Sequence, residues 1–169
     1  MRNGAVLAAL SLLVGCVAEK KAETLERVTL RRLTGSTFEL VPAENQHPHC
    51  LAFTIASNGV IRQLTMSREN MSYSCPAGRP IGGHSYRVPL DEGTVKIYVL
   101  FSSERINAAS VAQQLLDLRD RPKISSIDLR LPGNATIETI VFAPELDAPP
   151  PLGGLVGQDG VTDGDAGSP

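Results

Sequence analysis

Tryptophan is absent from this chain of 169 residues, and aromatic residues make up only 4% of it. Sugar-binding surfaces rely on exposed aromatic rings, so the composition argues against carbohydrate recognition. The formal net charge is only −2, which argues against a nucleic-acid partner, because such a partner requires a basic face that neutralises phosphates. No apolar run approaches the roughly 20 residues of a membrane-spanning helix, so an integral membrane protein is not predicted.

Recognisable catalytic motifs are also missing. The sequence has no Gly-x-Ser-x-Gly turn, no phosphate-binding glycine loop and no His-Glu-x-x-His pair. Ser85 follows His84 directly, but a catalytic pair depends on approach in space and on an orienting acid, not on adjacency in sequence. We therefore expect a protein that is not an enzyme and that needs no cofactor.

The first sixteen residues have the pattern of an export signal. Arg2 precedes an apolar stretch over 5–14, which is followed by Gly15 and Cys16. The segment Leu13-Val14-Gly15-Cys16 resembles the lipobox of bacterial lipoproteins, in which aliphatic and small residues precede an obligatory cysteine. An ordinary signal peptide with a chance cysteine is the alternative.

The lipobox resemblance implies that residues 1–15 are removed and that the Cys16 sulfur carries a diacylglyceryl group. The new amine is then available for a further acyl chain such as palmitate. Each buried methylene contributes about 0.8 kcal/mol, so two or three chains give stable membrane anchoring. Val17 follows the cysteine where an aspartate favours inner-membrane retention, which implies the outer membrane and its periplasmic face.

Composition divides the remainder into three parts. Residues 16–26 hold the lipidated cysteine and a charged tether, and residues 27–144 form the domain. Residues 145–169 contain three consecutive prolines, several glycines and five acidic residues but no basic one. Such a segment buries too little apolar surface to offset its ordering entropy, so we expect a disordered acidic tail.

Within the domain, apolar residues mostly recur at every second position, the period of β-strands. Asn58-Gly59 is a strong hairpin signal, and it predicts a turn between an alternating run at 51–55 and a second run over 60–66. The segment 94–101 is apolar on both faces, which predicts a central strand. Further runs occur at 38–40, 86–90, 127–131 and 136–142, with the last two forming a predicted hairpin.

One segment has helical periodicity instead. Asn107 is suited to cap a helix near residues 108–119, with Val111, Leu115 and Leu118 on one face. The sequence therefore predicts a mainly β fold, an antiparallel β-sandwich of about seven or eight strands with this one helix.

A series of short motifs follows in a fixed order along residues 35–120. They are the Asn58-Gly59 turn, Cys75-Pro76-Ala77-Gly78, Pro89-Leu90, Gly93, the strand Val95–Phe101 and Ser102-Ser103-Glu104-Arg105. This order resembles an uncharacterised β-sandwich domain found in bacterial lipoproteins and beside caspase-like peptidases or kinase domains. The resemblance implies a binding or accessory module without known catalytic residues.

Cys50 and Cys75 are the two cysteines that remain after Cys16. In an exported protein two such thiols most often pair, and a loop of about 25 residues would then contribute roughly 3–4 kcal/mol. Separate buried thiols are one alternative. A metal site is the other, because His47, His49 and Cys50 lie within four residues and His84 can complete a tetrahedral set for zinc or copper.

These observations predict a lipid-anchored cell-envelope protein that acts as a non-catalytic interaction or accessory module. Its expected partners are the membrane, through the lipid on Cys16, and another protein of the envelope. The alternative is a periplasmic metal-binding protein that uses the cluster of His47, His49 and Cys50.

Overall fold

A computed structural model describes residues 26–147. The predicted signal peptide, the lipidation site Cys16 and residues 148–169 of the predicted tail lie outside the described residues. Within residues 26–147, no helix is both long enough and apolar enough to span a membrane.

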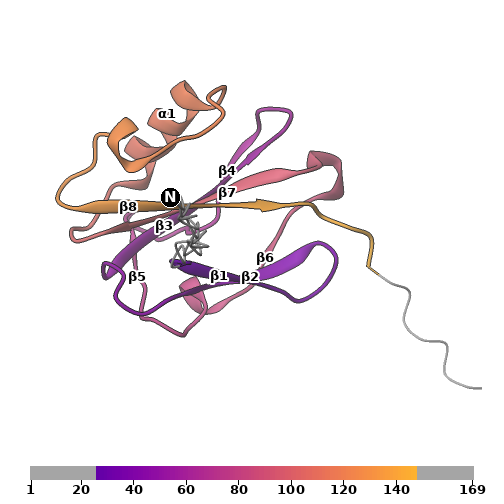
Figure 1. The fold of residues 1–169 in the computed structure, drawn as a ribbon, viewed down its shortest axis with the longest axis horizontal. Helices are drawn as coiled ribbons and strands as arrows, with labels where there is room; N and C mark the ends of the chain where they lie inside the picture. Colours follow the sequence, from indigo (N-terminus) through magenta and orange to yellow (C-terminus); the bar gives the residue numbers. More distant parts are fainter. Residues whose placement is uncertain (1–25, 148–169) are drawn as a thin grey trace, which may run out of the picture.

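The strands form two antiparallel sheets, which confirms the predicted mainly β sandwich. One sheet has three strands in the order β1-β2-β6, and the other has five, in the order β4-β3-β7-β8 with β5 also paired to β3. Figure 1 shows the two sheets stacked face to face. The strands are β1 (Val28–Arg32), β2 (Thr37–Pro42), β3 (His49–Ala56), β4 (Ile61–Gln63), β5 (Tyr73–Ser74), β6 (Tyr86–Arg87), β7 (Val95–Ser102) and β8 (Ala135–Phe142).

The main core fills the space between the two sheets. Successive side chains of a strand point to opposite faces, so β3 contributes Cys50 and Ala52 to this core, and β7 contributes its odd-numbered residues. At its centre, the Phe38 ring packs against Phe142 with 4.7 Å between ring centroids. This alternation is the pattern from which the strands were predicted.

A second core lies on the other face of the five-stranded sheet. There α1 (Ala108–Leu118) packs over Leu51, Phe53 and Tyr98. Figure 1 shows the helix above the five-stranded sheet. The Asn107 side chain accepts a hydrogen bond from the Ser110 amide, as expected of a helix N-cap. The molecule therefore has three layers, and β7 is apolar on both faces because both are covered.

The hairpin predicted at Asn58-Gly59 is present between β3 and β4. Gly59 has a φ of 83°, a conformation that glycine adopts without steric cost, and its amide donates to the Ala56 carbonyl. The returning strand is shorter than the predicted run over 60–66, because β4 contains only three residues. The run at 86–90 is likewise divided between β6 and a short 3-10 helix, Leu90–Glu92.

The predicted hairpin between 127–131 and 136–142 is wrong in its first half. Ser126–Asp128 forms a 3-10 helix, η3, and the Ile127 side chain is 92% exposed. The Asp128 carboxylate accepts hydrogen bonds from the Ser125 amide and hydroxyl, which closes this turn locally. The second half is correct, but β8 pairs along its whole length with β7.

The chain keeps contact with the domain after β8. The Glu145 amide donates to the Gly35 carbonyl at 2.9 Å, and the Gly35 amide donates to the Asp147 carboxylate at 2.6 Å. Arg32 also donates to the Ala143 carbonyl. The segment 143–147, where the predicted tail begins, therefore lies against the β1–β2 turn.

Candidate functional site

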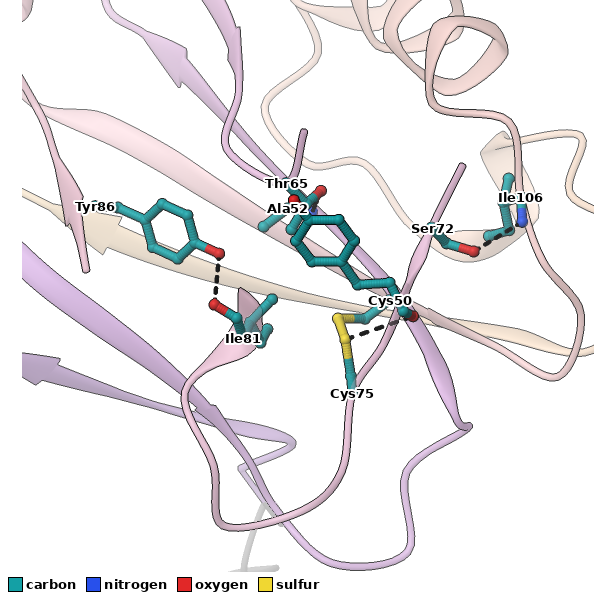
Figure 2. Close-up of a disulfide and its surroundings, with 9 residues drawn as sticks. Cys50, Ala52, Thr65, Ser72, Cys75, Ile81, Tyr86 and Ile106 are labelled. Carbon is teal, nitrogen blue, oxygen red and sulfur yellow. Dashed lines mark hydrogen bonds between the residues drawn. A yellow bond between two sulfur atoms is a disulfide. The ribbon is translucent and has the colours of Figure 1, made fainter. Parts of the chain in front are cut away.

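The predicted disulfide between Cys50 and Cys75 is present, with 5.9 Å between the two Cα atoms. It joins the start of β3 to the segment that follows β5, and both cysteines are buried in the main core. Figure 2 shows the bridge and, separately, the hydroxyl of Tyr86, which donates to the Ile81 carbonyl at 2.8 Å. The bridge fixes the loop between β5 and β6 to the five-stranded sheet, and the hydrogen bond fixes it to β6 of the three-stranded sheet.

The ligands of the alternative metal site, His47, His49, Cys50 and His84, do not assemble into a cluster. Cys50 is in the disulfide, so it has no thiolate to offer a metal. His49 and Cys50 are successive residues of β3 and therefore point to opposite faces of the sheet. His84 Nδ1 lies 2.8 Å from the Gly82 carbonyl oxygen. Among residues 26–147, no group of three or more His, Cys, Asp or Glu side chains is placed to hold a metal ion.

His84 and Ser85 line a shallow hollow of about 360 Å³ together with Tyr73 and Tyr86. The His84 ring packs edge-on against Tyr86, with 5.0 Å between ring centroids. No carboxylate is among the lining residues. A serine nucleophile requires a histidine base that is oriented by an acid, and this arrangement is not formed at the hollow.

A second hollow, of about 380 Å³, lies at the C-terminal end of α1 and is lined by Lys96, Arg119 and Arg121. Each cation is already engaged within the domain. Lys96 Nζ donates to the Pro122 carbonyl, Arg119 donates to the Leu116 carbonyl, and Arg121 forms an ion pair with Asp128 at 2.9 Å.

Asp128, the carboxylate that pairs with Arg121, has a lowered pKa. The hydrogen bonds from Ser125 hold the pKa of Asp128 below its ordinary value, and the Arg121 guanidinium lowers it further. Asp128 thus remains charged and keeps Arg121 occupied. Because its cations are engaged within the domain, we do not propose the second hollow as a binding site.

An apolar groove of about 510 Å³ runs between α1 and β4. Its floor is hydrophobic, and the three polar residues that line it carry uncharged amides. No charged side chain is among the lining residues, which are Phe53, Ile61, Gln63, Asn70, Ala109, Ala112, Gln113 and Leu116.

The groove exists because α1 has two adjacent apolar stripes. Val111 and Leu115 are fully buried in the second core, whereas Ala109, Ala112 and Leu116 lie on the neighbouring face that lines the groove. The two alanines leave space between helix and strand that larger side chains would fill. Leu116 is 39% exposed and contributes apolar surface to the groove.

The sequence analysis identified the core stripe of the helix but missed the groove. The spacing of Ala109, Ala112 and Leu116 gave a signal, since residues at i, i+3 and i+7 share a helix face. The opposing wall gave none: Ile61 and Gln63 lie on the returning strand of the predicted hairpin, but no sequence pattern placed that strand beside the helix. At about 510 Å³ the groove is larger than either hollow, of about 380 and 360 Å³, and we take it as the candidate binding site.

Comparison of the chain with protein-family models, with curated proteins and with solved structures finds no match.

Proposed function

We propose that this protein is a lipid-anchored component of a bacterial cell envelope whose domain binds another envelope protein without catalysing a reaction. The observation that carries the binding role is the apolar, uncharged groove between α1 and β4. The observation that supports the anchor is the segment Leu13-Val14-Gly15-Cys16 after an apolar stretch.

The lining of the groove defines the chemistry of its partner. A hydrophobic floor favours an apolar side chain, and the absence of charge from the lining disfavours an acidic or basic ligand. Side-chain amides of Gln63, Asn70 and Gln113 each offer donors and an acceptor, which suit the peptide groups of a bound chain. The occupant that we propose is a short, uncharged apolar segment of a protein partner.

The anchor places the domain near a membrane surface. Between Cys16 and the first residue of β1, Val28, the tether reaches at most about 40 Å when fully extended. In this proposal the membrane is the outer membrane and the domain faces the periplasm, as the residue Val17 implies. A partner would then be embedded in, or close to, the same membrane.

The groove is tested by cross-linked recovery of partners from intact envelopes with the full chain. Leu116→Glu introduces a charge into the groove, and Ile127→Glu introduces the same charge at a residue that is 92% exposed and outside it. We expect one protein to be recovered equally by the parent and by Ile127→Glu, and at least about tenfold less by Leu116→Glu. Equal recovery by all three chains would refute the groove, provided that their unfolding midpoints agree.

The anchor is tested separately by Cys16→Ser. The parent should sediment with membranes, and its mature N-terminal peptide should carry the mass of the acyl chains on Cys16. The variant should be released or should remain as an uncleaved precursor. Unchanged mass and membrane association in the variant would refute lipidation.

The metal-binding alternative predicts a different result. The protein purified without chelators would contain stoichiometric zinc or copper, which would be lost after His47→Ala or His49→Ala. Because Cys50 is in the disulfide, we do not favour this function.

A further inference from the structure

In the described part of the chain, the five-stranded sheet has an unpaired edge on the side away from the groove. In the five-stranded sheet β4 and β8 are the two outer strands, and the groove is beside β4. β8 contains eight residues, and within residues 26–147 it pairs with one strand only, β7. Figure 1 shows it as one of the longest strands, running along the border of the sheet.

The hydrogen-bond pattern identifies the backbone groups that are unpaired on this edge. The Ser103 amide donates to the Asn134 carbonyl, just beyond the last residue pair of β7 and β8, Ser102 and Ala135. Hydrogen-bonded pairs alternate in an antiparallel ladder, so the even-numbered residues of β8 bond to β7. The N–H and C=O groups of Ala135, Ile137, Thr139 and Val141 therefore face outward. No hydrogen bond from another residue within 26–147 reaches them.

This edge has few of the features that prevent edge strands from pairing. Prolines, bulges, lysines and inward-facing charges commonly block such edges. β8 has no proline, bulge or lysine in an unbroken register of eight residue pairs, and its one charged residue is the half-buried Glu138. By contrast, the outer strand β1 has only five residues and ends in Arg31 and Arg32. β4 has only three residues. Val141 on β8 is 67% exposed.

We propose that β8 is a dimerisation edge, on which a second copy of this chain adds its own β8 in antiparallel orientation about a two-fold axis at Thr139. In this register the two Thr139 residues exchange both backbone hydrogen bonds, and Ile137 lies opposite Val141 on each side of the axis. Because the axis is perpendicular to the sheet, side chains that face α1 in one copy meet side chains of the same face in the other.

Charge selects this register over its neighbour. A shift that centres the pair on Glu138 would place two half-buried carboxylates directly opposite each other, which is destabilising in a sheet. About Thr139, each Glu138 lies opposite Ile140 instead. Of the two registers that pair the most residues of β8, the one about Thr139 therefore avoids the like charges, and it makes the sheet continuous across both copies.

The proposed dimer goes beyond the proposed partner binding and does not depend on it. The groove borders β4, at the opposite edge of the sheet from β8. Pairing through β8 leaves both grooves open, so that one dimer presents two binding sites.

The register is tested by cysteine cross-linking of the full chain in the membranes where it is expressed. Two differently tagged copies are co-expressed as Thr139→Cys and oxidised. The Cα atoms of the two residues should be about 5.5 Å apart, within the range that a disulfide bridges. We expect a covalent dimer that contains both tags.

Two controls exclude other cross-links. Glu138→Cys should not cross-link, because in this register its two copies lie diagonally, about 7–8 Å apart. The parent chain tests whether Cys16 alone forms a dimer. A dimer of Glu138→Cys but not of Thr139→Cys would overturn the register, and no dimer of either would overturn the interface. A Thr139→Cys adduct with another protein would also overturn it.

A second variant tests the backbone pairing itself. Thr139→Pro removes an outward N–H without removing a bond to β7, which is the position where an edge strand tolerates proline. We expect the dimer dissociation constant, measured by light scattering in detergent, to rise at least about tenfold, while Thr139→Val leaves it unchanged. A parent chain that is monomeric in the same detergent and in membranes would refute the proposal.

Discussion

Arg62 on β4 forms an ion pair with Glu92, which lies in the 3-10 helix before β7. The Glu92 side chain is only 3% exposed, whereas that of Arg62 is 52% exposed. Glu92 Oε2 has no hydrogen-bond partner among the described residues. Arg62 is therefore the main compensation for a carboxylate that the fold has removed from water.

Replacement of Arg62 should destabilise the domain more than replacement of another surface arginine. Arg62→Ala leaves the buried Glu92 without a counter-charge, and we expect a loss of about 1–3 kcal/mol in the free energy of unfolding. Arg68→Ala, at an exposed arginine, should cost less than about 0.5 kcal/mol. Urea unfolding measures both. If Glu92→Gln does not restore part of the loss in the Arg62→Ala background, the ion pair is not the cause.

Removal of the disulfide should also reduce stability. The Cys50–Cys75 bridge closes a loop with a sequence separation of 25 residues, for which the chain-entropy model gives about 3–4 kcal/mol. Denaturant unfolding of the full chain with and without reductant should show this difference. The double variant Cys50→Ala/Cys75→Ala should be insensitive to reductant. Equal midpoints of the parent in both conditions would show that the bridge does not stabilise the fold.

Alkaline pH should unfold the protein through buried tyrosines. Burial raises the pKa of Tyr86 above its ordinary value, with a smaller contribution from Tyr73, and burial also raises the pKa of Tyr98. The unfolded chain loses these protons near pH 10, whereas the folded chain retains them. The contribution of each tyrosine is therefore fully present below about pH 10 and is lost as the pH rises above it.

Tyr86→Phe tests this linkage. The free energy of unfolding of the parent should fall above about pH 10, and the variant should show a shallower fall by up to about 1.4 kcal/mol per pH unit. At neutral pH the variant should lose about 1 kcal/mol, because the Ile81 carbonyl loses its donor. Identical alkaline slopes in the two proteins would mean that Tyr86 ionises without unfolding.

Local sequence patterns correctly predicted the elements whose apolar faces are buried in a core. The central strand at 94–101 and the helix at 108–119 correspond to β7 and α1, since each carries enough apolar residues to define a face. The strand predicted at 127–131 was wrong, because alternation of Ile127 and Leu129 resembles a strand while Ser125 and Asp128 close a turn. Here a local capping interaction outweighed a short apolar pattern.

The candidate site was less accessible from sequence than the fold. Nearness in sequence suggested His47, His49 and Cys50 as one cluster, but a strand separates consecutive side chains onto opposite faces. The groove depends on the distance between α1 and β4, two elements far apart in the chain. The distance between a helix and a strand is set by the pairing of all the strands in the sheet. A local sequence pattern carries no information about that pairing.

The contact between Gly35 and Glu145 predicts a stability coupling across the chain. A Cβ atom added at Gly35 would collide with the Glu145 carbonyl oxygen, so Gly35→Ala should destabilise the full chain by about 1–3 kcal/mol. A chain that ends at Ala143 lacks this carbonyl and the Asp147 carboxylate. It should be less stable than one that ends at Asp147 by about 1–2 kcal/mol, and Gly35→Ala should then cost little. Unfolding midpoints of the two truncations, each with and without Gly35→Ala, complete a double-mutant cycle. If Gly35→Ala costs the same in both, the strain arises within the β1–β2 turn and not from the segment that follows β8.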